Sequence, residues 1–419
     1  MNTERFTAPK KCACGKEHRS DIKYIFIENN AVSHLCDMCR GYNNILIVAD
    51  LNTYAAAGEK SERYLSGKNI TRQIFNPDGL LIPNEESIAE IEKRLGETEL
   101  IIGIGSGVIS DLCKYVSHFH KIPYYIVATA PSMDGYASSG AAMILGGMKK
   151  TVSAKMPDGF IGDTAILKDA PLEMIKAGYG DILGKYSSLN DWKLAHEILG
   201  EYFCDYIYSL TYEMLEEVLP LAKRLLAREE SAVKALTEAL IGVGIAIAYA
   251  GNSRPASGSE HHLSHFFEIT GLLCQKPYLP HGIDVAFSTL LTSRIREELC
   301  ATPFDKELFT MEQEKYRSEM KRVYSKVSDS CIALQKKTGY YTDRSPIYKT
   351  KEGILKAILE ECPTPAEIEK YLSEIELNTA QFYSIYSEKT IADALLYAKD
   401  LKDRFTVLWM YYDLIGERK

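Results

Sequence analysis

Three side chains far apart along the chain have the types expected of a catalytic metal site. Asp181 lies in Gly-Tyr-Gly-Asp, His261 in Ser-Gly-Ser-Glu-His and His281 in Pro-His-Gly. One carboxylate and two imidazoles suit a divalent cation of borderline softness, and three protein ligands leave coordination positions open for a substrate. His265 follows His261 by one helical turn, so we expect it to face the substrate beside the metal. We expect His262 to be a packed or solvated histidine.

A glycine-rich segment follows a strongly apolar run and precedes a helical pattern. Leu100-Ile-Ile-Gly-Ile is typical of a buried strand, and Gly103-Ile-Gly105-Ser-Gly107 separates it from the helix that opens with Val-Ile-Ser-Asp. Such glycines let the backbone approach a pyrophosphate, and the amides at the helix start attract its charge. The spacing differs from Gly-x-Gly-x-x-Gly, so a tight strand-to-helix turn without a ligand is an equal alternative.

Two further strand ends carry polar side chains. Asp50 closes the apolar run Ile-Val-Ala-Asp, where a carboxylate accepts hydrogen bonds from an adenosine ribose or caps the next helix. The segment from Val127 to Ser138 leaves another strand with several hydroxyls and one carboxylate, that of Asp134. In open α/β sheets, ligands bind at the carboxyl ends of strands. We therefore expect the three strand ends to face one binding crevice.

The elements that position these residues change in character near residue 168. Before it, apolar runs alternate with amphipathic stretches, which predicts an α/β domain with a parallel sheet of Rossmann-like type. The expected strands are Tyr24–Ile27, Asn44–Ala49, Leu100–Ile104 and Pro123–Ala128, and the expected helices are Tyr54–Leu65, Glu85–Leu95 and Val108–Phe119. Long amphipathic segments then predict an all-α domain. The expected division is an N-terminal extension 1–22, a dinucleotide-binding domain 23–168 and a helical metal- and substrate-binding domain 169–419.

Composition narrows the class of protein. The 419 residues are 46% hydrophobic and 25% charged, with a net charge of −8, which is typical of a globular protein large enough for two domains. Without a basic stripe, we expect neither nucleic acid nor an anionic membrane as partner. Met1 to Lys23 lacks the apolar centre of a signal peptide, and we expect no apolar run near the roughly 18 residues that span a bilayer. Cytoplasmic location is the expectation.

The ten cysteines form two kinds of pattern. Six are scattered through apolar or helical sequence, where reduced thiols behave as small hydrophobes, so we expect no structural disulfides. Near the N-terminus, Cys12-Ala-Cys14, His18 and Cys36-Asp-Met-Cys39 bring two close pairs that suit zinc. Reduced cysteines in a short β-hairpin are the alternative, and the sequence leaves the choice open.

The combined segments resemble the glycerol-1-phosphate dehydrogenase family, in the fold group of dehydroquinate synthases and iron-containing alcohol dehydrogenases. The resemblance runs from about Cys12 to Trp409, and it rests on ordered matches: Asp50-Leu-Asn-Thr, Gly105-Ser-Gly107 to Asp111, Thr129-Ala-Pro-Ser-Met-Asp-Gly-Tyr-Ala-Ser138, Gly180-Asp181, Ser257-Gly-Ser-Glu-His261, Pro280-His-Gly282 and Asp403-Arg-Phe-Thr406.

The resemblance implies an activity and a site. The activity is reversible, NAD(P)-dependent interconversion of dihydroxyacetone phosphate and sn-glycerol 1-phosphate, often by homodimers with zinc or nickel; iron also suits the ligands. The metal would be held by Asp181, His261 and His281, and the catalytic, substrate-facing residues would be Asp134, Asp181 and His265. The dinucleotide would contact Asp50, Gly107, Val108, Ile109, Ser110, Asp111, Thr129, Ala130, Pro131, Ser132 and Ser138.

These roles suggest a mechanism in which the metal acts as a Lewis acid on the ketone oxygen while hydride arrives from the nicotinamide. His265, or a water relay through the ribose, would supply the proton, and Asp134 would orient substrate hydroxyls. The residues that bind the substrate phosphate are not identified, and Lys149, Lys150 and Lys185 are candidates only. Asp50 favours NAD because a carboxylate repels a 2′-phosphate.

Three other functions remain as alternatives. A dehydrogenase of another polyol or polyol phosphate fits the same residues. A dehydroquinate-synthase-like lyase also uses NAD and a metal, but that family has glutamate where Asp181 stands. A catalytically silent nucleotide- or metal-sensing protein is disfavoured because the three expected metal ligands are all present.

Overall fold

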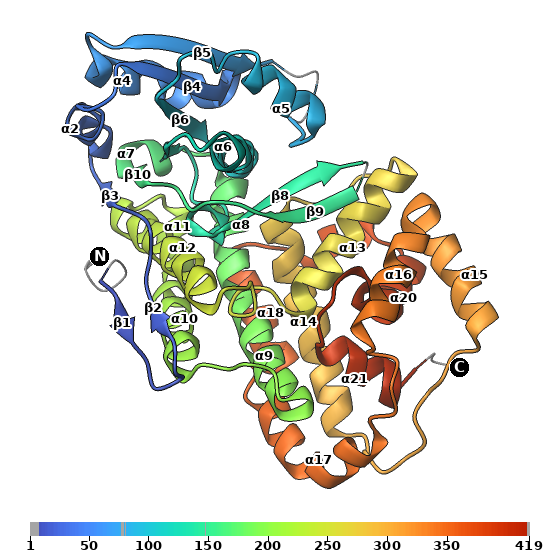
Figure 1. Cartoon of the computed structure of the whole chain (residues 1–419). Helices are drawn as coiled ribbons and strands as arrows, with labels where there is room; N and C mark the ends of the chain where they lie inside the picture. Colours follow the sequence, from blue (N-terminus) through green and yellow to red (C-terminus); the bar gives the residue numbers. More distant parts are fainter. Residues whose placement is uncertain (1–7, 77–78, 80, 147, 417–419) are drawn as a thin grey trace. The chain divides into compact units, whose positions relative to one another are not determined.

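The structure is a computed structural model that describes residues 8–76, 79, 81–146 and 148–416. The chain divides into two compact units, each assembled from segments that are separate in sequence. Unit 1 comprises 1–179 and 216–252, and unit 2 comprises 180–215 and 253–419. Figure 1 colours the elements of both units along the chain.

Unit 1 is built on a parallel sheet in which six described strands take part. All four expected strands are present in it, together with two that the apolar patterns did not predict. The strands are β3 (Tyr24–Glu28), β4 (Asn44–Asp50), β5 (Asn69–Phe75), β6 (Leu100–Gly105), β7 (Tyr124–Ala128) and β10 (Gly159–Asp163). The central strands β6 and β7 are buried along their whole length, which explains their continuous apolar runs.

The order of the strands makes β7, β6 and β4 neighbours, so the loops that follow them lie at the same carboxyl end of the sheet. Across the sheet the order is β3-β10-β7-β6-β4-β5. The chain moves from β4 to its neighbour β5 and then returns to the opposite side of β4 with β6. The order therefore reverses between β4 and β6, and such a switch point is where open α/β sheets bind ligands. The loops after β4, β6 and β7 adjoin this point.

Unit 1 also contains two hairpins and a set of helical segments. The hairpin β1–β2 joins Lys10–Lys11 to Glu17–His18, and a second antiparallel hairpin joins β8 (Gly140–Leu145) to β9 (Met148–Ser153). The helical segments are η1 (Ala31–His34), α2 (Leu35–Met38), α3 (Leu51–Thr53), η2 (Tyr54–Gly58), α4 (Glu59–Glu62), η3 (Arg63–Leu65), α5 (Glu85–Glu92), α6 (Gly107–His120), η4 (Asp134–Ala137), α7 (Thr164–Leu167), most of α8 (Leu172–Leu183), η5 (Leu219–Leu221), α11 (Ala222–Leu226) and α12 (Glu230–Ala250).

Helix α12 departs from two of the sequence expectations. It belongs to unit 1, although the expected helical domain began at residue 169, because it packs against η4, α7 and β3. It is also long and apolar enough to cross a membrane by length and composition, which the sequence reading did not anticipate. Its apolar window is 72% buried inside the structure, as expected for a core helix, which is hydrophobic all round.

Unit 2 is helical in its described residues, as the loss of strand patterns predicted. Its helical segments are α9 (Lys185–Leu199), the first part of α10 (Asp205–Val218), α13 (Ser259–Cys274), α14 (His281–Cys300), α15 (Gln313–Tyr324), η6 (Ser325–Val327), α16 (Ser328–Thr338), α17 (Ser345–Glu360), α18 (Pro365–Glu374), α19 (Thr379–Ile385), α20 (Glu388–Tyr397), η7 (Ala398–Leu401) and α21 (Val407–Leu414). Helix α14 contacts α13, α17, α18 and α21 and is the central helix of this unit.

Candidate metal centre and nucleotide-binding loops

Two adjacent helices of unit 2 bring three histidines together. His261 and His265 lie in the first two turns of α13, and His281 is the first residue of α14. The ring centroids of His261 and His281 are 5.1 Å apart, and those of His265 and His281 are 5.4 Å apart. The Ser264 hydroxyl lies 3.2 Å from Nδ1 of His281. These imidazoles are thus gathered although 20 residues of chain separate the first from the last.

Asp181, in the last turn of α8, is the carboxylate of this cluster. Its Oδ1 lies 3.7 Å from Nε2 of His261 and 2.7 Å from Nζ of Lys185. Burial opposes ionisation of Asp181, but the charge of Lys185, with contributions from His261 and His281, lowers the pKa of this carboxyl. The carboxylate is therefore charged at neutral pH, and a cationic group already lies against it.

Glu260 fixes the orientation of the His261 ring. Its Oε1 lies 2.7 Å from Nδ1 of His261 and accepts the backbone N–H of Gly258 at 2.8 Å. With Nδ1 donating to the carboxylate, the lone pair of Nε2 is on the Asp181 side of the ring. Burial and the Lys185 ammonium hold the pKa of His261 well below its ordinary value, which favours the neutral imidazole that metals bind.

A buried ion pair fixes the start of α13. Arg296 donates to Oδ1 of Asp191 at 2.9 Å, and Oδ2 of Asp191 accepts the backbone N–H of Ser259 at 2.6 Å. Both side chains are almost fully buried, so removal of one would leave an uncompensated charge. The sequence did not predict this pair or the role of Glu260, and it named Lys185 only as a candidate for the substrate phosphate, because these contacts are set by the tertiary structure.

Close backbone contact between α8 and α14 brings Asp181 near His281. A Cβ atom added to Gly180 would lie 2.3 Å from the carbonyl oxygen of Gly282. Gly180 and Gly282 are the chain neighbours of the two expected ligands, so these helices approach each other only because position 180 has no side chain.

Gly180→Ala is therefore expected to separate Asp181 from His281. We expect weaker metal retention and a loss of about 1–3 kcal/mol in the free energy of unfolding, the usual cost of overpacking. Urea unfolding and metal analysis after dialysis measure both effects. Gly353→Ala is the matched control: Gly353 is a helical glycine in α17 with open space around its Cβ position, and it should be neutral or slightly stabilising. Equal behaviour of the two variants would contradict the argument.

The expected phosphate cradle of unit 1 lies at the switch point of the sheet. Strand β6 ends at Gly105, and α6 begins at Gly107 with no side-chain cap on its first turn. Added Cβ atoms at these glycines would lie 2.6 Å from Ile109 and 3.1 Å from Met133, respectively. Thr129, which follows β7, donates its backbone N–H to the Gly105 carbonyl at 3.1 Å. The loops after β6 and β7 therefore adjoin, with helix N–H groups at their centre.

Asp50 has the capping role that the sequence left open. Its Oδ1 accepts the backbone N–H of Thr53 at 2.9 Å, and its own N–H donates to the Thr53 hydroxyl at 3.0 Å. This reciprocal capping fixes Asp50 at the end of β4, next to β6. These local hydrogen bonds account for its position, and its contact with a nucleotide ribose stays a prediction.

A buried lysine positions the segment that carries Asp134 and Ser138. Lys114 of α6 donates to the carbonyl of Gly140 at 3.1 Å and to that of Gly135, and it lies 3.4 Å from the hydroxyl of Ser138 and 3.6 Å from Asp111. Burial lowers the pKa of Lys114, which the Asp111 carboxylate opposes. The sequence reading missed Lys114, because a lysine on a helix ordinarily faces solvent.

The lysines considered for the substrate phosphate differ in position. Lys185 is fully buried and its ammonium forms an ion pair with Asp181, which does not favour a role in binding a substrate phosphate. Lys150 is exposed on β9, and the Lys149 side chain lies outside the described part of the structure. His262 is fully buried, so of the two expected states, packed or solvated, it has the packed one.

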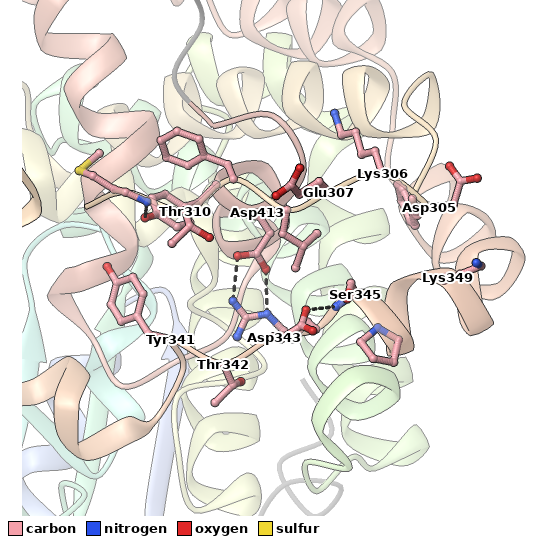
Figure 2. Close-up of a pocket in the computed structure, with 17 residues that line it drawn as sticks. Asp305, Lys306, Glu307, Thr310, Tyr341, Thr342, Asp343, Ser345, Lys349 and Asp413 are labelled. Atoms are coloured by element: carbon pink, nitrogen blue, oxygen red, sulfur yellow. Dashed lines mark hydrogen bonds and ion pairs between the residues drawn. The ribbon is translucent and has the colours of Figure 1, made fainter. Parts of the chain in front are cut away.

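Unit 2 also contains a pocket that is lined by other residues than those of the expected site. It has a volume of about 740 Å³ and includes none of the expected site residues. Its wall carries the ion pair of Arg344 and Asp413, with contacts of 2.8 and 3.0 Å. Figure 2 labels Asp413 and marks its contacts with dashed lines. The labelled charged residues around it, Asp305, Lys306, Glu307, Asp343 and Lys349, carry both signs, so the lining does not favour one ligand class.

The fold and the sequence can be compared with known proteins. The iron-containing alcohol dehydrogenase family matches residues 26–171. A solved iron-containing alcohol dehydrogenase from Thermococcus thioreducens aligns with a TM-score of 0.61 at 15% identity, covering 95% of each chain. A glycerol dehydrogenase from Schizosaccharomyces pombe aligns with a TM-score of 0.55 at 16% identity, covering 85% of this chain and 92% of its own. These likenesses establish the fold.

Relatives found by sequence similarity identify the family more narrowly than the solved structures do. A glycerol-1-phosphate dehydrogenase (NAD(P)+) from Halalkalibacterium halodurans is 35% identical over 293 residues, which cover 68% of this chain and 73% of that protein. A protein of the same name from Thermoplasma acidophilum is 34% identical over 278 residues, covering 65% of this chain and 77% of its own. The chain belongs to the glycerol-1-phosphate dehydrogenase family.

Proposed function

We propose that this protein is an NAD(P)-dependent, metal-dependent sn-glycerol-1-phosphate dehydrogenase. In the direction of reduction, dihydroxyacetone phosphate, NAD(P)H and one proton give sn-glycerol 1-phosphate and NAD(P)+. The observation that carries the proposal is the gathering of Asp181, His261 and His281 from three helices, in a chain whose relatives bear this name. Membership of the family implies a nicotinamide cofactor and a divalent metal.

The donor set fits a divalent metal. Asp181 is an ionised buried carboxylate, and His261 is a neutral imidazole whose Nδ1 is engaged by Glu260. The ammonium of Lys185, 2.7 Å from Asp181, helps to keep this carboxylate ionised. Zinc, nickel and ferrous iron all suit such ligands. When bound, the metal supplies Lewis acidity at the substrate carbonyl.

Protein side chains supply the remaining steps. His265 stacks against His281 one turn beyond His261, and we assign it the delivery of a proton to the carbonyl oxygen of the substrate as hydride reaches the carbon. Asp134 is buried in η4, and we assign it the orientation of substrate hydroxyls. The nicotinamide dinucleotide is assigned to the loops after β4, β6 and β7 and to the start of α6.

The cofactor preference is expected to depend on Asp50. Asp50→Asn keeps a good N-cap for α3 but removes the charge that repels a 2′-phosphate. We expect kcat/KM for NADPH relative to NADH to rise roughly tenfold, or about 1.4 kcal/mol, with little change in thermal unfolding. Steady-state kinetics with both cofactors measure the ratio.

Asp163→Asn is the control for that experiment, since Asp163 also caps a helix but at the end of β10. It should leave the cofactor ratio unchanged. An unchanged ratio in Asp50→Asn itself would limit Asp50 to its capping role.

Substrate assays test the proposed activity directly. Metal-reconstituted protein should oxidise NADH faster with dihydroxyacetone phosphate than with dihydroxyacetone or glyceraldehyde 3-phosphate, and the product should be the sn-1 stereoisomer. Faster turnover of dihydroxyacetone would favour the alternative of a glycerol-type polyol dehydrogenase, whose fold this chain shares. Cytoplasmic location, a homodimer and the absence of nucleic-acid partners belong to this proposal as expectations.

A further inference from the structure

The N-terminal hairpin of unit 1 gathers two thiols and an imidazole. The ligand atoms of Cys12, Cys14 and His18 all lie within 4.8 Å of one another. Sγ of Cys14 and Nε2 of His18 are 3.4 Å apart. We propose that these three side chains bind a zinc ion that holds the hairpin together, with no ligand shared with the proposed catalytic metal.

The distances suit zinc. Zinc bonds sulfur at about 2.3 Å and imidazole nitrogen at about 2.0 Å, which separates neighbouring ligand atoms of a tetrahedron by roughly 3.5–3.8 Å. The pair formed by Cys14 and His18 already has this spacing, and Cys12 needs only a small side-chain adjustment. A thiol–imidazole hydrogen bond would explain the contact of Cys14 with His18, but it would not explain why Cys12 also converges.

The backbone of the hairpin holds the ligands in this arrangement. Gly15 has a φ of +86°, and its N–H donates to the Cys12 carbonyl at 3.1 Å. Cys12 donates its own N–H to the carbonyl of Lys16 at 3.0 Å. The tight turn therefore brings Cys12, Cys14 and the following strand back to one point. Glycine suits the left-handed conformation that this turn requires.

The hairpin is short and its strands are largely exposed. Each of its strands, β1 and β2, is two residues long, and Lys10, Lys11 and Glu17 are exposed. Isolated two-stranded hairpins are marginal in water, and small elements without a core are commonly cross-linked by disulfides or metals. His18 is the buried anchor: it is 1% exposed and stacks on Tyr249 of α12 with ring centroids 5.4 Å apart.

The chemistry of the cluster favours zinc over nickel and ferrous iron. Thiolates with imidazole form the usual ligand set of structural zinc. Cys12 and Cys14 are partly exposed, which gives the metal an entry path. The sequence had suggested Cys36 and Cys39 as further zinc ligands, but this second pair does not take part. Cys39 is buried in the hydrophobic core beside the sheet, and burial raises the pKa of its thiol to about 12.

Cobalt substitution tests the site, because only thiolate ligands give a sulfur-to-cobalt charge-transfer band and the proposed catalytic ligands contain no sulfur. The full-length protein, reduced, stripped of metal and reloaded with cobalt, should show the band. His281→Ala should keep it, while Cys12→Ser with Cys14→Ser should abolish it and lose one equivalent of zinc per chain. Cys36→Ser, on exposed Cys36 of α2, is the matched control and should keep band and zinc.

Two further measurements guard against misfolding and identify the fourth ligand. His18→Ala retains both thiols, so a shifted or weakened cobalt band in a variant with normal circular dichroism would support the imidazole as a ligand. Serine variants of the other cysteines, buried Cys204 of unit 2 included, would show whether a third thiolate completes the tetrahedron. A wild-type protein without the charge-transfer band, or a band unchanged in the double serine variant, would overturn the proposal.

Discussion

Replacing His281 with alanine is expected to lower kcat/KM for dihydroxyacetone phosphate by more than about a thousandfold and to release the catalytic metal. Lewis-acid stabilisation contributes several kcal/mol, and each 1.36 kcal/mol is tenfold in rate. His281 lies at the start of α14, with its ring 5.1 Å from that of His261, so its loss removes one of three proposed ligands. NADH oxidation and elemental analysis of dialysed protein measure turnover and metal together.

The control for His281 is His196→Ala, because His196 is an exposed histidine of unit 2 outside the proposed site. That variant should retain metal and turnover within about twofold, since exposed substitutions are usually mild. Full activity in a His281→Ala protein shown to contain no metal would remove His281 from the metal site and end the Lewis-acid mechanism. Loss of turnover with metal fully retained would instead assign His281 to substrate contact.

The sequence predicted the strands that form continuous apolar runs and missed the two strands that do not. Strands β3, β4, β6 and β7 are continuous apolar runs, and each was expected within one or two residues of its observed bounds. Strand β5 is an edge strand with polar side chains, and β10 is a five-residue strand that contains two glycines. Their strand conformation follows from pairing with neighbours, a tertiary effect that local patterns do not carry.

The residues of the candidate site also divide into those that local sequence patterns predicted and those that they did not. The proposed ligands were found because aspartate and histidine stand in distinctive short segments that resemble one family. Their supporting contacts were not predicted: Arg296 meets Asp191 across 105 residues of chain, and Lys185 was named only as a candidate for the substrate phosphate, because no sequence feature indicates that it pairs with Asp181. The unit to which α12 belongs was also missed, because an apolar helix can pack in either half of the chain.

Lys185→Met is expected to reverse the pH dependence of stability at Asp181. Lysine and aspartate are both buried, and their charged atoms are 2.7 Å apart. Without metal, removing the ammonium leaves the carboxylate uncompensated, which costs about 3–5 kcal/mol. Urea unfolding in the presence of a chelator, followed by tryptophan fluorescence, measures this loss. Both tryptophans of the chain, Trp192 and Trp409, lie in unit 2, so the signal reports the unit that contains the change.

The sign of the pH effect separates a charge role from a packing role. In the wild type the pKa of Asp181 is lowered, so its stabilisation is present above the unfolded pKa, near 3.9, and is lost as pH falls through the folded pKa. In Lys185→Met, burial dominates and raises the folded pKa, so stability falls as pH rises above about 4. The deficit should therefore be larger at pH 8 than at pH 5, and added divalent metal should reduce it.

The control is another lysine of the same helix. Lys193 of α9 pairs with Glu361 at 2.6 Å, but both side chains are partly exposed, at 27% and 41%. Lys193→Met should therefore cost no more than about 1 kcal/mol at either pH. The lost hydrogen bond from Lys185 to the Ala256 carbonyl does not titrate, so it contributes equally at both pH values. A deficit in Lys185→Met that is the same at pH 5 and pH 8 would therefore mean that Lys185 stabilises by packing and hydrogen bonding, and that Asp181 is not held ionised by its charge.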